Sequence, residues 1–127
     1  MKRWVNVVLL AAIVVDSVLP LMALFAPQLW FQILHGTADQ PEQHAFLLRC
    51  AAHWVAFLIV QLVALPLWRK RPEMLLIVAG ARFSDVLTDV TYLVSSSTSP
   101  LGTALLMSPP FFNAGMAAVL LLAYRER

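Results

Sequence analysis

The chain has 127 residues, of which 61% are hydrophobic and 13% are charged, and its mean hydropathy is +0.78. A soluble domain carries about a quarter charged residues, so these values exclude an ordinary soluble domain and a disordered chain. The single cysteine, Cys50, excludes an internal disulfide. The formal net charge of +2 gives no indication of a nucleic-acid partner.

Four apolar stretches each approach the length that a helix needs to cross a membrane, about 20 residues. They take up most of the chain and leave no room for a separate soluble domain. We therefore expect one all-α transmembrane domain over residues 1–127, a four-helix bundle that runs up-down-up-down. The predicted spans are 5–25, 45–68, 73–94 and 101–123.

The positions of the basic residues predict the orientation of these spans. Basic side chains lie before the first span, between the second and third, and after the fourth, whereas the other two connections contain none. Cytoplasmic loops are enriched in Lys and Arg, so all three groups share one side when four spans leave both termini in the cytoplasm. The groups are Lys2 and Arg3; Arg69, Lys70 and Arg71; and Arg125 and Arg127.

Residues 27–36 predict a short helix at the membrane surface, between the first two spans. Pro27 suits the first position of a helix, and Gly36 suits its C-terminal cap. The helix either closes the outer end of the bundle or serves as a recognition element.

Ser108-Pro109-Pro110 interrupts the fourth stretch. Prolines inside a helix leave carbonyl groups one turn earlier without donors. Ser followed by Pro is typical of a helix start, so a new helix can begin at Ser108 after a short half-helix over 101–107. The alternative is a kinked but continuous span.

Ionisable residues inside the spans are the strongest functional signal in the sequence. Each costs about 2.5–3.5 kcal/mol at the membrane centre, so these residues must face one another or water. In the third span, Arg82, Asp85, Asp89 and Tyr92 are spaced so that they share one helix face. We expect this face to point into the bundle.

Polar residues of the other spans are predicted to meet this face. Arg49 and His53 are four residues apart and share a face of the second span. Asp16 in the first span and Asn113 in the fourth lie at depths that allow them to join a middle layer.

The charge balance of this set predicts ion pairs and one protonated acid. The expected pairs are Arg82 with Asp16 or Asp85, and Arg49 with Asp89. Three Asp against two Arg leave one carboxyl group without a basic partner unless His53 is protonated. Burial favours the neutral form of such a group, which makes Asp85 or Asp89 a candidate acid with His53 as its proton partner. The alternative is a purely structural network that specifies helix packing.

The sequence predicts neither a metal site nor a cofactor. His44 and His53 are nine residues apart and lie on opposite faces of a helix, so they do not form a two-histidine metal site. His35 lies in the outer connection, away from the spans.

Several short motifs follow a pattern seen in a known family. They are Phe25-Ala26-Pro27 at the end of the first span, Gly36 in the outer segment, Leu47-Leu48-Arg49 at the start of the second span, and Ala81-Arg82-Phe83 in the third. With them the chain resembles the small, DoxX-like, four-helix bacterial membrane proteins. The resemblance implies a four-helix fold in the bacterial cytoplasmic membrane and no particular activity.

Three functions fit this pattern. The first is an accessory subunit or lipophilic-ligand-binding membrane protein, alone, as a homo-oligomer or in a larger membrane complex. The second is an intramembrane acid–base enzyme of the isomerase or cyclase type, acting on an isoprenoid, sterol or quinone-like substrate, in which Asp85 or Asp89 is the acid and Arg82 or Arg49 holds a developing anion. The third is a proton or ion carrier that uses Asp16, Asp85 and Asp89. The expected partners are the lipid bilayer and a lipophilic small molecule.

Overall fold

The computed structural model describes residues 2–126, which are all-α. The first three predicted spans coincide with single helices, except for Trp68, the fourth is divided between two helices, and the predicted short helix follows the first span. The helices are α1 (Lys2–Phe25), α2 (Pro27–His35), α3 (Pro41–Leu67), α4 (Glu73–Ser95), α5 (Pro100–Leu106) and α6 (Pro109–Arg125). Arg127, the last of the basic residues named above, lies outside the described residues.

Three segments of the described chain are long and apolar enough to cross a membrane: α1, α3 and the stretch Pro100–Arg125 that α5 and α6 form together. α4 has a similar length but carries Arg82, Asp85 and Asp89. Large apolar side chains such as Val18 and Ile59 are exposed along these helices. Extensive exposed apolar surface is unfavourable in water. These features indicate a helical, multi-pass membrane protein.

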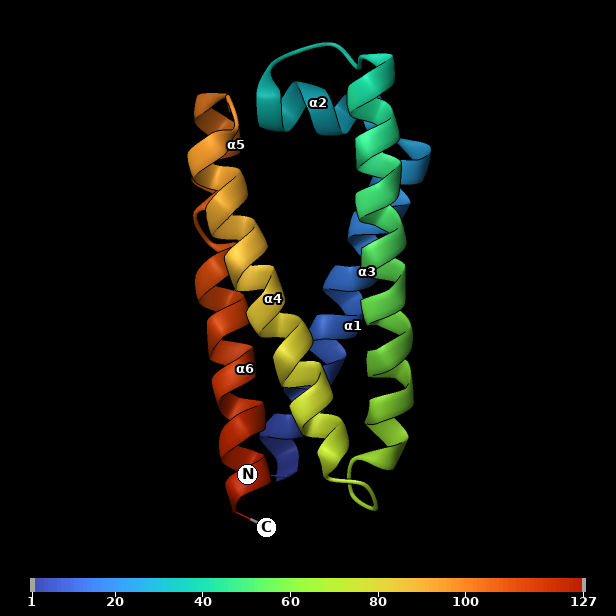
Figure 1. Cartoon of the computed structure of the whole chain (residues 1–127), viewed down its shortest axis with the longest axis vertical. Helices are drawn as coiled ribbons and strands as arrows, with labels where there is room; N and C mark the ends of the chain where they lie inside the picture. The colour runs from blue at the N-terminus through green and yellow to red at the C-terminus, as the bar shows by residue number, and fades with distance from the viewer. Residues whose placement is uncertain (1, 127) are drawn as a thin grey trace.

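The long helices form two pairs that diverge toward one end of the molecule (Figure 1). α1 packs along α3 and α4 packs along α6, and the pairs meet through α3–α4 and α1–α6 contacts. The chain ends and the connection between α3 and α4 lie at the same end, and α2 lies across the opposite end (Figure 1). The described basic residues of the three predicted groups therefore lie at one end of the molecule.

Two apolar clusters form the core, one toward each end of the molecule. The cluster near the chain ends includes Leu9, Trp68 and Leu120, all at most 1% exposed. The Trp68 indole N–H donates to Asn6 Oδ1 at 2.9 Å, so its polar atom is satisfied inside this cluster. The second cluster packs Trp30 and Phe31 of α2 against α1 and α3.

α2 begins and ends where the sequence predicts. Pro27 occupies its first turn, and Gly36 adopts the left-handed conformation with φ of 66° at its C-terminal end. The Gly36 N–H donates to the Gln32 carbonyl at 3.1 Å, which satisfies a carbonyl group at the helix end. The C-terminal cap at Gly36 is confirmed.

The fourth apolar stretch is broken at the two prolines. α5 ends at Leu106 and α6 begins at Pro109, as in the alternative with a new helix start. Ser108 precedes α6 but does not cap it: its hydroxyl donates to the Leu105 carbonyl at 3.2 Å, and its backbone stays in the right-handed helical region. The prediction of side-chain capping by Ser108 is therefore wrong, because the chain passes the break without leaving helical geometry.

Candidate functional site

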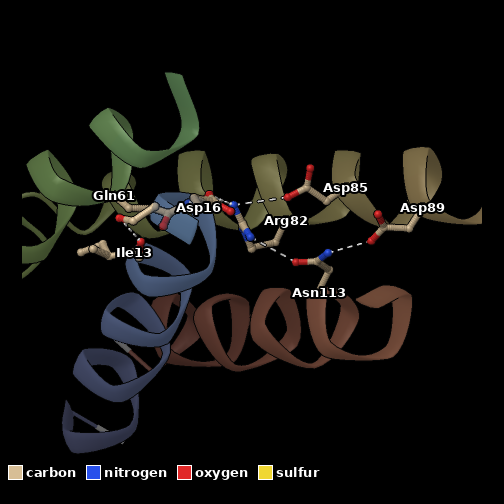
Figure 2. A network of polar contacts seen from close by, with 8 residues as sticks. Ile13, Asp16, Gln61, Arg82, Asp85, Asp89 and Asn113 are labelled. Carbon is tan, nitrogen blue, oxygen red and sulfur yellow. Dashed lines mark hydrogen bonds and ion pairs between the residues drawn. The ribbon is translucent and has the colours of Figure 1, made fainter. Parts of the chain in front are cut away.

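A network of polar side chains connects the four long helices between the two apolar clusters (Figure 2). Its most buried members are Asp16 of α1, Gln61 of α3, Arg82 of α4 and Asn113 of α6. Buried polar groups are stable only when they bond one another. The network therefore fixes how the four helices are rotated relative to one another.

The ion pair between Arg82 and Asp16 is the centre of this network. Arg82 Nη2 contacts Asp16 Oδ2, and both side chains are 1% exposed. Gln61 Nε2 donates to the same carboxylate oxygen at 2.5 Å. The predicted pairing of Arg82 with Asp16 is confirmed, and Gln61 adds a partner from α3 that the sequence-based set did not include.

A second arm of the network leads from Arg82 toward less buried carboxyl groups (Figure 2). Asp85 Oδ2 lies 3.3 Å from Arg82 Nη2, and the Asp85 side chain is 14% exposed. Asn113 Oδ1 accepts from Arg82 Nη1 at 3.2 Å, and Asn113 Nδ2 donates to Asp89 Oδ2 at 2.9 Å. Asn113 thus joins the middle layer, as predicted, and links Arg82 to Asp89.

Arg49 and His53 do not join this network. Both residues are exposed, and among the ion pairs of residues 2–126 none involves Arg49. His53 Nδ1 lies 2.9 Å from the Arg49 carbonyl one turn earlier in the same helix. The predicted Arg49–Asp89 pair is wrong, and His53, the predicted proton partner of Asp85 or Asp89, bonds only within its own helix among the described hydrogen bonds. The reason is the rotation of α3, which buries Leu47 and Ala51 and turns the opposite face outward.

The charge balance of the network differs from the predicted one. Without Arg49, three carboxyl groups share one guanidinium. Because uncompensated charge is costly in a low-dielectric interior, this ratio favours a proton on at least one of the less buried carboxyl groups, Asp85 and Asp89.

Tyr92 belongs to a separate polar cluster at the α2 end of the molecule. Its hydroxyl lies 2.5 Å from His35 Nε2, and His35 Nδ1 lies 2.8 Å from the Ser97 carbonyl oxygen. A carbonyl oxygen only accepts hydrogen bonds, so Nδ1 carries a ring hydrogen, and in the neutral imidazole Nε2 accepts from the Tyr92 hydroxyl. The spacing of Tyr92 on α4 gave no sign of this partner, which lies 57 residues away in the chain.

The segment around α5 binds the C-terminal end of α2. The Ser99 N–H donates to the Leu34 carbonyl at 2.8 Å, and the Ser99 hydroxyl donates to the Ile33 carbonyl at 2.7 Å. Gly102 lies so close that a Cβ atom there would be 2.0 Å from the Leu34 oxygen. α2 is therefore held firmly across the end of the molecule, next to Tyr92.

An open groove lies on the part of α4 nearest to α2. Its volume is about 380 Å³, and its lining residues are Leu87, Thr88, Thr91, Tyr92 and Ser95. Tyr92 connects it to the cluster with His35, and Thr88 lies one helical turn from Asp85. The groove thus combines an apolar wall with several hydroxyl groups.

In the part of the chain that the structure describes, no three His, Cys, Asp or Glu side chains form a group that could hold a metal ion.

No protein-family model, curated protein or solved structure matches the chain. The resemblance to the DoxX-like membrane proteins therefore stays a prediction.

Proposed function

We propose that α4 is a fourth membrane span and that the chain is an up-down-up-down four-helix bundle of the bacterial cytoplasmic membrane, with both termini in the cytoplasm. The 23 residues of α4 extend about 35 Å, enough for a hydrocarbon core of about 30 Å. The buried Arg82–Asp16 pair supports this proposal because it keeps the central charge of α4 away from lipid. Ile77, Phe83 and Val94 give α4 an exposed apolar surface suited to lipid.

Within this architecture, we propose that the protein binds a lipophilic small molecule, as a separate protein or as a subunit of a larger membrane complex. The observation that carries the proposal is the open depression of about 380 Å³ whose five lining residues all lie on α4, next to the polar network. Small-molecule sites are concave, mostly apolar, and lie in the range of about 300–1,000 Å³, with a few polar groups that orient the ligand. A ligand dissolved in the bilayer would reach this groove directly from the lipid.

Native mass spectrometry of gently solubilised protein tests this proposal. We expect a lipophile to remain bound, and an absorbance spectrum of the same preparation would reveal a pigment. Leu87→Trp should fill the groove and remove the bound molecule. Ile77→Trp is the matched control, because Ile77 is similarly exposed on α4 but does not line the groove. Wild-type protein that retains no lipophile would contradict the proposal.

The second candidate function is acid–base catalysis on such a molecule. It is favoured by the ratio of three carboxyl groups to one guanidinium, which leaves Asp85 or Asp89 able to hold a transferable proton. In this version His53 has no part, because it lies on the outward face of α3.

Deuterium exchange tests this second candidate. Wild-type protein in D₂O should introduce deuterium at carbon in the bound lipophile, detected by mass spectrometry after extraction. Asp85→Asn and Asp89→Asn should each abolish the incorporation, whereas Asp39→Asn in the connection between α2 and α3 should not. Incorporation that survives in both network variants would remove the acid–base mechanism.

A further inference from the structure

The groove on α4 presents mainly hydrogen-bond acceptors. The Thr88 hydroxyl donates to the Ser84 carbonyl at 3.0 Å, and the Ser95 hydroxyl donates to the Thr91 carbonyl. A hydroxyl group has one proton and two lone pairs, so both oxygens keep acceptor capacity toward the groove. Their donor capacity is already used within α4.

The Tyr92 hydroxyl has also used its donor capacity, but through a contact outside α4. The Ser97 carbonyl places a hydrogen of His35 on Nδ1, and with a neutral imidazole the Tyr92 hydroxyl donates to His35 Nε2. The tyrosine oxygen then has lone pairs only, and one of them accepts a hydrogen bond from the Trp30 indole N–H. Among the described hydrogen bonds, the Thr91 hydroxyl takes part in none, so Thr91 can supply one donor to the groove.

From this arrangement we infer that the groove selects a lipophilic molecule with a hydroxyl group, an alcohol or a phenol. This inference rests on the proposed ligand-binding function and names the ligand class. A hydroxyl group can donate to Thr88, Tyr92 or Ser95 and at the same time accept from Thr91. An ether or a ketone has no proton to donate and can use only Thr91.

Because its lining is uncharged, the groove should bind an alcohol better than an amine. None of the five lining residues carries a charge. An ammonium group next to apolar and hydroxyl side chains would lose its hydration, and the neighbouring carboxyl groups of Asp85 and Asp89 already bond Arg82 and Asn113. An uncharged donor therefore fits the lining better than a cation.

Matched ligands test this inference directly. We would measure binding of 4-octylphenol, 4-octylanisole and octylamine to the full chain in lipid nanodiscs by native mass spectrometry. The phenol and the anisole differ only by replacement of the hydroxyl hydrogen with a methyl group. The phenol should bind about tenfold more tightly, the factor expected from one additional hydrogen bond in a desolvated site. A long-chain alcohol and its methyl ether, used as a second pair, distinguish alcohols from phenols as the better source of the hydroxyl group.

Two substitutions test whether the preference for a hydroxyl group arises from the residues that line the groove. Thr88→Val keeps the side-chain shape and removes an acceptor, and Tyr92→Phe removes the phenolic oxygen. Each should reduce the ratio of phenol binding to anisole binding. Thr37→Val, outside the groove, should keep the full ratio. Because Tyr92→Phe also breaks the contact with His35, Thr88→Val remains the deciding variant if the Tyr92 variant does not fold.

The outcomes separate this inference from the proposed function. Equal binding of phenol and anisole, tighter binding of octylamine, or a ratio unchanged in Thr88→Val would overturn the hydroxyl preference and leave lipophilic-ligand binding standing. If none of the probes binds and no lipophile is retained after purification, the proposed function itself fails.

Discussion

Replacing both carboxylates that contact Arg82 should destabilise the protein by more than the sum of the two single replacements. The guanidinium side chain of Arg82 is 1% exposed. Its ionic partners are Asp16 and, at 3.3 Å, Asp85. Each single replacement leaves one counterion in contact, whereas the double replacement leaves none.

The contacts set the expected magnitudes. Asp16→Asn removes a buried, charge-assisted hydrogen bond and should cost about 2 kcal/mol. Asp85→Asn should cost about 1 kcal/mol, because the Asp85 side chain is partly exposed and its contact is longer. The double variant leaves a buried guanidinium without a counterion and should cost about 5 kcal/mol, a coupling of about 2 kcal/mol.

Equilibrium unfolding in mixed micelles of mild detergent and sodium dodecyl sulfate, followed by circular dichroism, measures these differences. Glu73→Gln is the control: its pair with Arg71 spans 3.9 Å and is exposed, so it should change stability by less than about 1 kcal/mol. If the losses of unfolding free energy in the two single variants add to that of the double variant within about 0.5 kcal/mol, Asp16 and Asp85 do not share the neutralisation of Arg82.

Three further predictions concern the contacts that Ser99 and Gly102 make with the C-terminal end of α2, and the orientation of the chain in the membrane. Gly102→Ala should loosen α2, seen as faster hydrogen exchange of its amides, because the new Cβ would meet the Leu34 oxygen at 2.0 Å. Gly115→Ala is the control: a Cβ there has nothing within 4 Å, so the substitution should be neutral or stabilising by up to about 1 kcal/mol. If the α2 amides stay equally protected from exchange in both variants, the close contact at Gly102 does not hold α2 in place. Ser99→Ala should cost about 1 kcal/mol in detergent unfolding, because it removes the bond to Ile33 and the N-terminal cap of α5. Ser97→Ala, which contributes only its backbone carbonyl to His35, should cost little, and equal losses in the two variants would argue against this role of Ser99. In a Cys50→Ser background, Ala38→Cys should react with a membrane-impermeant maleimide in intact cells, whereas Lys70→Cys should react only after permeabilisation. The opposite labelling pattern would reverse the proposed orientation.

Much of the candidate site was predictable from spacing within one helix. Arg82, Asp85 and Asp89 share a face of α4, and each of them enters the network. The depth of Asn113 in the fourth stretch predicted that its side chain would join the network. Gln61 gave a weaker signal, a single polar residue in an apolar helix, and its contact with Asp16 depends on how α1 and α3 pack.

The errors at Arg49 and His53 share one cause, the rotation of a helix about its own axis. Arg49 and His53 share a face of α3 as predicted, but that face points outward. In a soluble protein, the apolar stripe shows which face of a helix is buried. A membrane helix is apolar on all sides, because lipid is as apolar as the protein interior, so this signal is weak. α3 extends about 40 Å, longer than the hydrocarbon core, so its first turns can carry polar residues near the headgroups.

The sequence by itself determined the features that depend on neighbouring residues. These are the length of the apolar stretches, the cap at Gly36 and the polar stripe of α4; whether the fourth stretch breaks at Pro109 was decided by the structure. Only the tertiary structure decided which side chains meet across helices: Gln61 with Asp16, Asn113 with Asp89, and His35 with Tyr92. Local composition sets where a helix begins and ends, whereas partner choice depends on packing between helices that lie far apart in the chain.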